Sequence, residues 1–190
     1  MLNSTIGFAI CGSFCTYSKA IPALEALAQQ CSQVIPIFSQ ASYETDTRFG
    51  TATSHREAVE RICGRPALHL LTEVEPIGPK KLLDALVVAP CTGNTLAKLA
   101  AGIADGPVTM AVKSHLRNGR PVILAVSTND GLGVAAENIG KLLARKYIYF
   151  VPFGQDDPVK KPTSLVADFS RLPEAVAEAL EGRQLQPVLI

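Results

Sequence analysis

Short apolar runs alternate with segments of helical periodicity along most of this chain, and this alternation constrains its fold more than any other feature. The expected strands cover residues 6–11, 34–38, 85–89, 121–126 and 147–151. The expected helices cover residues 19–30, 53–63, 78–83, 95–101, 107–117, 134–145 and 172–180. Strands that are apolar at nearly every position are typical of a parallel sheet buried on both faces. We therefore expect an α/β fold with a three-layer, doubly wound, mostly parallel sheet.

Composition narrows the classes of protein that the chain can represent. It has 190 residues, 47% hydrophobic and 18% charged, so it can bury one substantial core, and we expect residues 1–190 to form a single domain. The formal net charge is +1 and the lysine clusters are short, which argues against nucleic-acid binding. No apolar stretch reaches the roughly eighteen residues of a membrane span. Residues 1–4 do not resemble a charged leader.

The reactive side chains suggest a reducing compartment. The five cysteines are odd in number and contain no Cys-x-x-Cys pair, and the three histidines are scattered. This usage favours free thiols in a cytoplasm over disulfides, and it predicts no metal site.

Small polar residues follow four of the expected strands. They are Gly12, Ser13 and Thr16 after the first strand, Ser39 after the second, residues 90–95 after the strand at 85–89, and residues 127–130 after the strand at 121–126. In a doubly wound fold, ligands bind beyond the carboxyl ends of the strands, so these loops should share one edge. Neutral donors of this kind suit a phosphate held at helix N-termini and a planar ring held by its polar rim, which predicts a phosphorylated, ring-bearing cofactor.

The segment from Pro90 to Thr95 is the most specific of these loops. An apolar strand ends in a proline, a small glycine-bearing turn follows, and a helix opens with hydroxyl and amide side chains. Free backbone N–H groups at such a helix start attract anions. The alternative is an ordinary strand-to-helix turn capped by Thr92 or Asn94, and spacing alone leaves both open.

Two further segments have open interpretations. Residues 131–136 fit the G-x-G-x-x-A dinucleotide fingerprint, but they follow a late strand, whereas that fingerprint usually marks the first strand–helix turn. Residues 40–52 and 152–168 are polar and lack periodicity, so we expect long loops over the ligand edge, either functional or disordered.

Several stretches of the sequence resemble a known superfamily. Residues 90–100 resemble the P-A-S-A-N-T-type signature of the flavin-binding cysteine decarboxylases and flavin prenyltransferases, which are homo-oligomeric FMN proteins with a flavodoxin- or Rossmann-like doubly wound fold. Within that superfamily, residues 75–86, 115–121 and 127–130 are similar to the family of dipicolinate synthase B subunits. The resemblance spans nearly the whole chain.

The resemblance implies a set of FMN-binding residues. Gly12, Ser13 and Phe14 would lie along the phosphate and ribityl chain, and Ser39 would add a hydroxyl. The signature from Pro90 to Thr95, with Cys91, Thr92, Gly93 and Asn94, would meet the phosphate or the ring edge. Ser127 would close the site.

The departures from the superfamily pattern are equally informative. The position of the decarboxylases' catalytic histidine is occupied by Pro76, which has no ionisable group. His69 lies seven residues too early, and we expect it to cap or pack. The decarboxylase substrate-clamp motif is not apparent after the strand at 121–126. Cys91 at a helix start is either a nucleophile with a lowered pKa or a small packing residue, and no histidine is placed to activate it.

The resemblance also implies a function. The chain would be the flavin-binding subunit of a dipicolinate synthase, oxidising dihydrodipicolinate to dipicolinic acid in the cytoplasm of a sporulating mother cell. Its partner would be the A subunit of the synthase, which would bind NADP. A dicarboxylate needs cationic partners, and Lys80, Lys81, Lys113, Arg117, Lys160 and Lys161 are candidates by charge alone.

Other functions and an assembly state follow from the same resemblance. The alternatives are an FMN-dependent decarboxylase or a flavin prenyltransferase-like enzyme, or a non-catalytic scaffold without flavin. No catalytic residue is assigned. Superfamily members form trimer-based homo-oligomers, and we expect the apolar tail at residues 185–190 to pack on a neighbouring copy.

Overall fold

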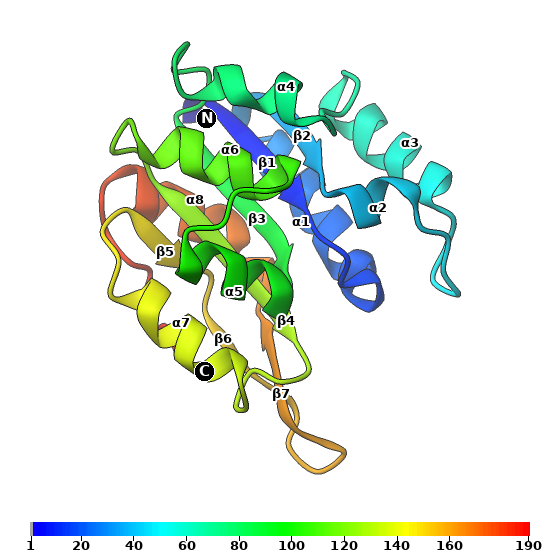
Figure 1. Ribbon diagram of the computed structural model, residues 1–190, viewed down its shortest axis with the longest axis vertical. Helices are drawn as coiled ribbons and strands as arrows, with labels where there is room; N and C mark the ends of the chain where they lie inside the picture. Colours follow the sequence, from blue (N-terminus) through cyan, green and yellow to red (C-terminus); the bar gives the residue numbers. More distant parts are fainter. Residues whose placement is uncertain (1) are drawn as a thin grey trace.

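The computed structural model describes residues 2–190, and its centre is a seven-stranded sheet (Figure 1). The strands are β1 (Leu2–Ile10), β2 (Cys31–Phe38), β3 (Ala85–Cys91), β4 (Val122–Thr128), β5 (Ile148–Phe150), β6 (Phe153–Asp157) and β7 (Lys161–Ala167). The order is β2-β1-β3-β4-β7-β6, with β5 also paired to β4. Strands β1 to β5 pair in parallel, which confirms the predicted doubly wound α/β class.

Helices cover both faces of this sheet. On one face lie α1 (Tyr17–Ala28) and α8 (Leu172–Leu180), which pack against each other. On the other lie α5 (Gly93–Ala101), α6 (Pro107–Leu116) and α7 (Ala135–Leu143), with the short α4 (Leu71–Val74) beside α6. Helices α2 (Gln40–Glu44) and α3 (Ala52–Cys63) lie beside β2. Three 3₁₀ turns cover Phe14–Thr16, Glu75–Ile77 and Phe169–Arg171. Along residues 2–190, every helix is too short or too polar to span a bilayer.

Strand β4 has different neighbours at its two ends. Val122 to Leu124 pair with β5 in parallel, whereas Ser127 and Thr128 pair antiparallel with β7. The β6–β7 hairpin therefore stands beside the carboxyl end of β4 and extends away from the body of the molecule (Figure 1). The expectation of a loop at 152–168 was wrong. A search for apolar runs misses strands β6 and β7 because most residues around the hairpin turn are exposed and polar.

Two other local expectations were wrong. Residues 78–83 form no helix, and Lys81 among them has a positive φ of 50°. The chain here passes close to α6, since a Cβ at Gly78 would lie 2.5 Å from the backbone oxygen of Ser114. Residues 40–44 form α2, which Ser39 caps by accepting a hydrogen bond from the backbone N–H of Ser42. Helix α3 is capped in the same way by Thr51, whose side chain accepts a hydrogen bond from the backbone N–H of Ser54.

The C-terminal tail pairs with its own chain. The N–H of Ile190 donates to the backbone oxygen of Phe153 at 3.1 Å, and the N–H of Phe153 donates to the backbone oxygen of Val188 at 3.0 Å. The side chains of Leu189 and Ile190 remain exposed. The packing of this tail on a neighbouring copy stays a prediction.

Candidate functional site

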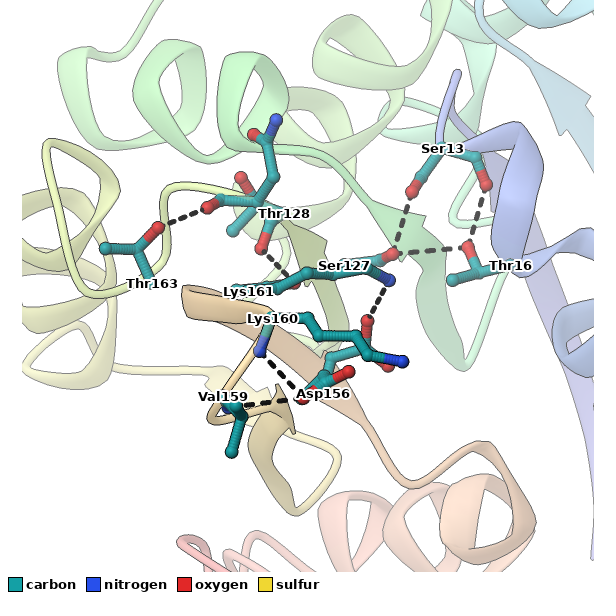
Figure 2. Close-up of polar contacts among 12 residues, drawn as sticks. Ser13, Thr16, Ser127, Thr128, Asp156, Val159, Lys160, Lys161 and Thr163 are labelled. Atoms are coloured by element: carbon teal, nitrogen blue, oxygen red, sulfur yellow. Dashed lines mark hydrogen bonds and ion pairs between the residues drawn. The ribbon is translucent and has the colours of Figure 1, made fainter.

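The loop after β1 meets the end of β4 through a cluster of hydroxyl groups. The Oγ atoms of Ser13 and Ser127 lie 2.7 Å apart, although 114 residues separate them in the chain. Ser127 also contacts Thr16, with 3.2 Å between the hydroxyl oxygens, and Thr16 donates to the backbone oxygen of Ser13 at 2.7 Å. Figure 2 shows these three side chains pointing toward one another. The predicted convergence of the first and last of the four loops is therefore confirmed.

The start of α5 joins the same edge. Thr92 caps the helix by accepting a hydrogen bond from the N–H of Thr95 at 3.2 Å. The hydroxyl of Thr95 donates to the Sγ atom of Cys11, at the end of β1, at 3.2 Å. The backbone N–H groups of Gly93 and Asn94 have no acceptor within residues 2–190. The first turn of α5 thus offers open donors at its positive end.

The four loops line two adjoining open hollows, which share Gly12, Thr92 and Asn94. The larger hollow, about 700 Å³, is lined by Gly12 to Thr16, Arg48, Phe49, Thr92 to Asn94, Ser127 to Asp130, Asp156, Lys161 and Ser164 to Val166. The smaller, about 520 Å³, is lined by Cys11, Gly12, Ser39 to Ala41, Thr92, Asn94, Thr95, Lys98 and Asp105 to Thr109. Both volumes lie in the range typical of cofactor and small-ligand sites.

Nine of the eleven predicted site residues line one of these hollows. They are Gly12, Ser13, Phe14, Ser39, Thr92, Gly93, Asn94, Thr95 and Ser127. The other two, Pro90 and Cys91, are buried in β3 and line neither. Pro90 lies where the β3–β4 register shifts between Val88 and Cys91, an irregularity that suits a residue without an N–H donor.

The larger hollow leaves no room for a side chain at Gly93. A Cβ there would lie 2.7 Å from the Oγ1 of Thr128 and 2.9 Å from a carboxylate oxygen of Asp130. Thr128 donates a short hydrogen bond to that same carboxylate. A side chain at residue 93 would therefore displace this pair, which lines the larger hollow.

The buried thiols have the chemistry of packing residues. Burial raises the pKa of Cys91 well above its ordinary value, and burial raises the pKa of Cys11 to about 11 despite the hydrogen bond from Thr95. A thiol needs to ionise before it can attack, so the packing interpretation of Cys91 holds over the nucleophilic one. Cys15, by contrast, is exposed and lines the larger hollow.

This difference predicts a selective pattern of alkylation. With iodoacetamide at pH 8, Cys15 should be modified, while Cys11, with only about one thiol in a thousand ionised, and Cys91 should stay unmodified until the protein unfolds. Peptide mass spectrometry over time measures the three rates. Alkylation of Cys91 in the folded protein at a rate similar to that of Cys15 would contradict this assignment.

Two other sequence features lie away from the hollows. The ring of His69 stacks on Tyr43 with 3.8 Å between centroids, and its backbone N–H donates to Glu73 at 2.8 Å, which confirms a packing role. Residues 131–136 line neither hollow, and a Cβ at Gly131 would lie 2.5 Å from the side chain of Leu165. That glycine permits close packing against β7.

Sequence reasoning missed Arg48, Phe49 and Asp156 as lining residues. Each lies in a segment that we expected to be a long polar loop over the ligand edge. The only sequence signal for these three residues was their position in a segment expected to cover the ligand edge, because neither segment has a periodic pattern. Among the six cations considered for a dicarboxylate, only Lys161 lines a hollow.

Comparison with known proteins identifies the family of this chain. The family model described as "Flavoprotein" matches residues 1–171. The chain belongs to the flavoprotein family. It is 44% identical over 185 residues to the B subunit of dipicolinate synthase from Bacillus subtilis (strain 168), covering 97% of this chain and 92% of that protein.

Solved structures agree with this assignment. The crystal structure of the dipicolinate synthase B subunit from Bacillus halodurans superposes with a TM-score of 0.91 at 44% identity, covering 100% of this chain and 97% of the other. DmrB of Burkholderia xenovorans in complex with FMN superposes with a TM-score of 0.68 at 20% identity, covering 94% of this chain and 96% of the other. The second likeness shows a shared flavoprotein fold alone.

Proposed function

We propose that this chain is the flavin-binding B subunit of a dipicolinate synthase and that it holds FMN across the two hollows. The observation that carries the proposal is the convergence of four loops on one edge, with nine of the eleven predicted site residues lining it. The identity of 44% to a dipicolinate synthase B subunit supports the enzyme class.

The residues present fit a phosphorylated, ring-bearing cofactor. The smaller hollow lies at the starts of α2, α5 and α6, with Ser39, Thr92, Thr95 and Thr109 on its walls. Hydroxyls and the open N–H group of Asn94 would hold the phosphate there. The larger hollow has Phe14 on its walls, beside the Ser13–Ser127 cluster, and would receive the isoalloxazine ring.

The chemistry of the reaction divides between cofactor and protein. When bound, FMN supplies a two-electron acceptor for the conversion of a dihydropyridine ring into an aromatic one. The protein residues bind and orient: Ser13 and Ser127 fix the position of two loops relative to each other, and the cap at Thr92 fixes the start of α5. The β6–β7 hairpin lines the larger hollow on one side through Asp156, Lys161 and Ser164 to Val166.

The proposal includes an assembly. We propose that the A subunit of the synthase binds this chain and supplies NADP. We also propose a trimer-based homo-oligomer of this chain, a single domain over residues 1–190, and a place in the mother cell of a sporulating bacterium. The partner is supported by the designation of the 44% identical relative as a B subunit.

The decarboxylase alternative is weaker in this chain. Pro76, at the position of the decarboxylases' catalytic histidine, lies in the turn Glu75–Ile77 and lines neither hollow. The scaffold and prenyltransferase alternatives are outcomes of the experiment that follows.

The visible spectrum of the purified protein provides the first test. We expect oxidised-flavin absorbance with one FMN per chain, and we expect tighter binding of FMN than of riboflavin because riboflavin lacks the phosphate. Dihydrodipicolinate should then be oxidised when the partner subunit and NADP are added. A colourless protein that does not bind FMN on titration would favour the scaffold. FMN-dependent prenyl transfer or decarboxylation without oxidation of dihydrodipicolinate would favour the alternatives.

A further inference from the structure

Two cationic side chains line the larger hollow, from segments far apart in the sequence. Arg48 follows α2, and Lys161 begins β7. Lys161 is paired with Asp156 at 2.7 Å, as Figure 2 shows, whereas Arg48 has no ion-pair partner within residues 2–190. The other carboxylate of this hollow, Asp130, accepts a hydrogen bond from Thr128. Arg48 is therefore the cation of the hollow whose charge is uncompensated.

Arg48 stands on a turn with a defined shape. Thr47 and Gly50 exchange two backbone hydrogen bonds, of 3.0 and 3.1 Å, and the N–H of Phe49 donates to the Thr47 hydroxyl at 3.1 Å. Gly50 has a φ of +138°, and a Cβ there would lie 2.6 Å from the Nε2 of His55. The turn thus depends on glycine and is seated against α3.

Phe49 gives this turn an apolar surface beside the cation. Its side chain is 45% exposed although it lines the hollow, and the Arg48 guanidinium carbon lies 4.8 Å from its ring centroid. A planar guanidinium beside an open aromatic ring offers a bidentate partner for a carboxylate and a surface for a flat ring.

Lys161 can serve a second anion. A lysine ammonium has three N–H donors, and the Asp156 carboxylate is the one acceptor paired with it within residues 2–190. The Asp156 contact holds Lys161 at the hollow. A ligand with two carboxylates could therefore contact a cation from each segment.

We propose that the turn Thr47–Gly50 is the substrate-recognition element of this site: Arg48 binds one carboxylate of a planar ring dicarboxylate, Phe49 covers the ring, and Lys161 binds the second carboxylate. The inference rests on the proposed function for the identity of the ring. It assigns a role to two residues, Arg48 and Phe49, that the sequence did not single out.

The test is calorimetric titration of the full chain, FMN-loaded and FMN-free, with dipicolinate and with picolinate, which has a single carboxylate. We expect Arg48→Met to weaken dipicolinate binding at least about tenfold. Lys161→Met should lower the affinity for dipicolinate to that for picolinate. Arg61→Met, an exposed arginine on α3, and Lys160→Met, the neighbouring lysine of the hairpin, are matched controls and should stay within about twofold of the wild type.

The outcomes separate this inference from the FMN proposal. If FMN binds but Arg48→Met leaves dipicolinate affinity within about twofold, the inference is overturned while the cofactor proposal stands. If FMN does not bind but dipicolinate does, and Arg48→Met removes it, recognition stands and the cofactor proposal fails. No dipicolinate binding by the wild-type protein in either form would also overturn the inference.

Discussion

Replacing Gly93 with valine should weaken FMN binding by a factor on the order of one hundred, equivalent to about 2.7 kcal/mol. The new side chain would begin with a Cβ within 3 Å of Thr128 and Asp130, two residues that line the larger hollow, and it would stand at the start of α5. The open N–H groups of Gly93 and Asn94 would then lose their approach to an anion. Titration of the apoprotein with FMN, followed by quenching of flavin fluorescence, measures the loss.

A second glycine provides the control for this substitution. Gly140 also lies in a nine-residue helix, α7, and nothing lies within 4 Å of a Cβ built on it. Gly140→Val introduces the same side chain without touching the site, so it should retain FMN affinity, and Gly93→Ala should show an intermediate loss. Equal affinity of Gly93→Val and Gly140→Val would place the cofactor elsewhere.

Lowering the pH from 7 to 5 should reduce the free energy of unfolding by about 2 kcal/mol through His115 alone. His115 is fully buried on α6, its Nε2 lies 3.1 Å from the backbone oxygen of Pro121, and its Nδ1 has no partner within residues 2–190. Burial, followed by the nearby Arg120 charge, lowers its pKa from 6.5 to about 4. Below pH 6.5 His115 is protonated in the unfolded chain, whereas in the folded chain it stays neutral down to about pH 4. The free energy of unfolding therefore falls as the pH falls through this window.

Urea unfolding at pH 7, 6 and 5 measures this contribution. His115→Gln should be less stable than the wild type at pH 7, because it loses the fitted imidazole, but its stability should fall less between pH 7 and 5. Val112→Ala, a buried truncation on the same helix, should be destabilised by about 1–3 kcal/mol and keep the wild-type pH dependence. An identical slope for His115→Gln and the wild type would show that His115 does not carry the effect.

The core of the fold was predictable because burial on both faces leaves a strong pattern. Strands such as Ala85–Cys91 are apolar at every position, and they alternate with helices, so the parallel order follows from general rules of chain connection. The β6–β7 hairpin was not predictable in this way, since its exposed strands contain residues such as Gln155 and Lys161. Its place beside Ser127 and Thr128 depends on a pairing that no local pattern encodes.

The residues of the site also fall into those that the sequence predicted and those that it did not. The sequence by itself determined that small polar residues follow the strands, because parallel strands bring their carboxyl ends to one edge and turn chemistry selects Gly, Ser, Thr and Asn there. Only the tertiary structure decided which side chains face the hollows: Cys91 turns into the core, while Arg48 and Lys161, from two segments without periodicity, both line the larger hollow. The reason is physical, since the direction of a side chain is set by packing between segments far apart in the chain, and a loop's path depends on contacts that sequence spacing does not specify.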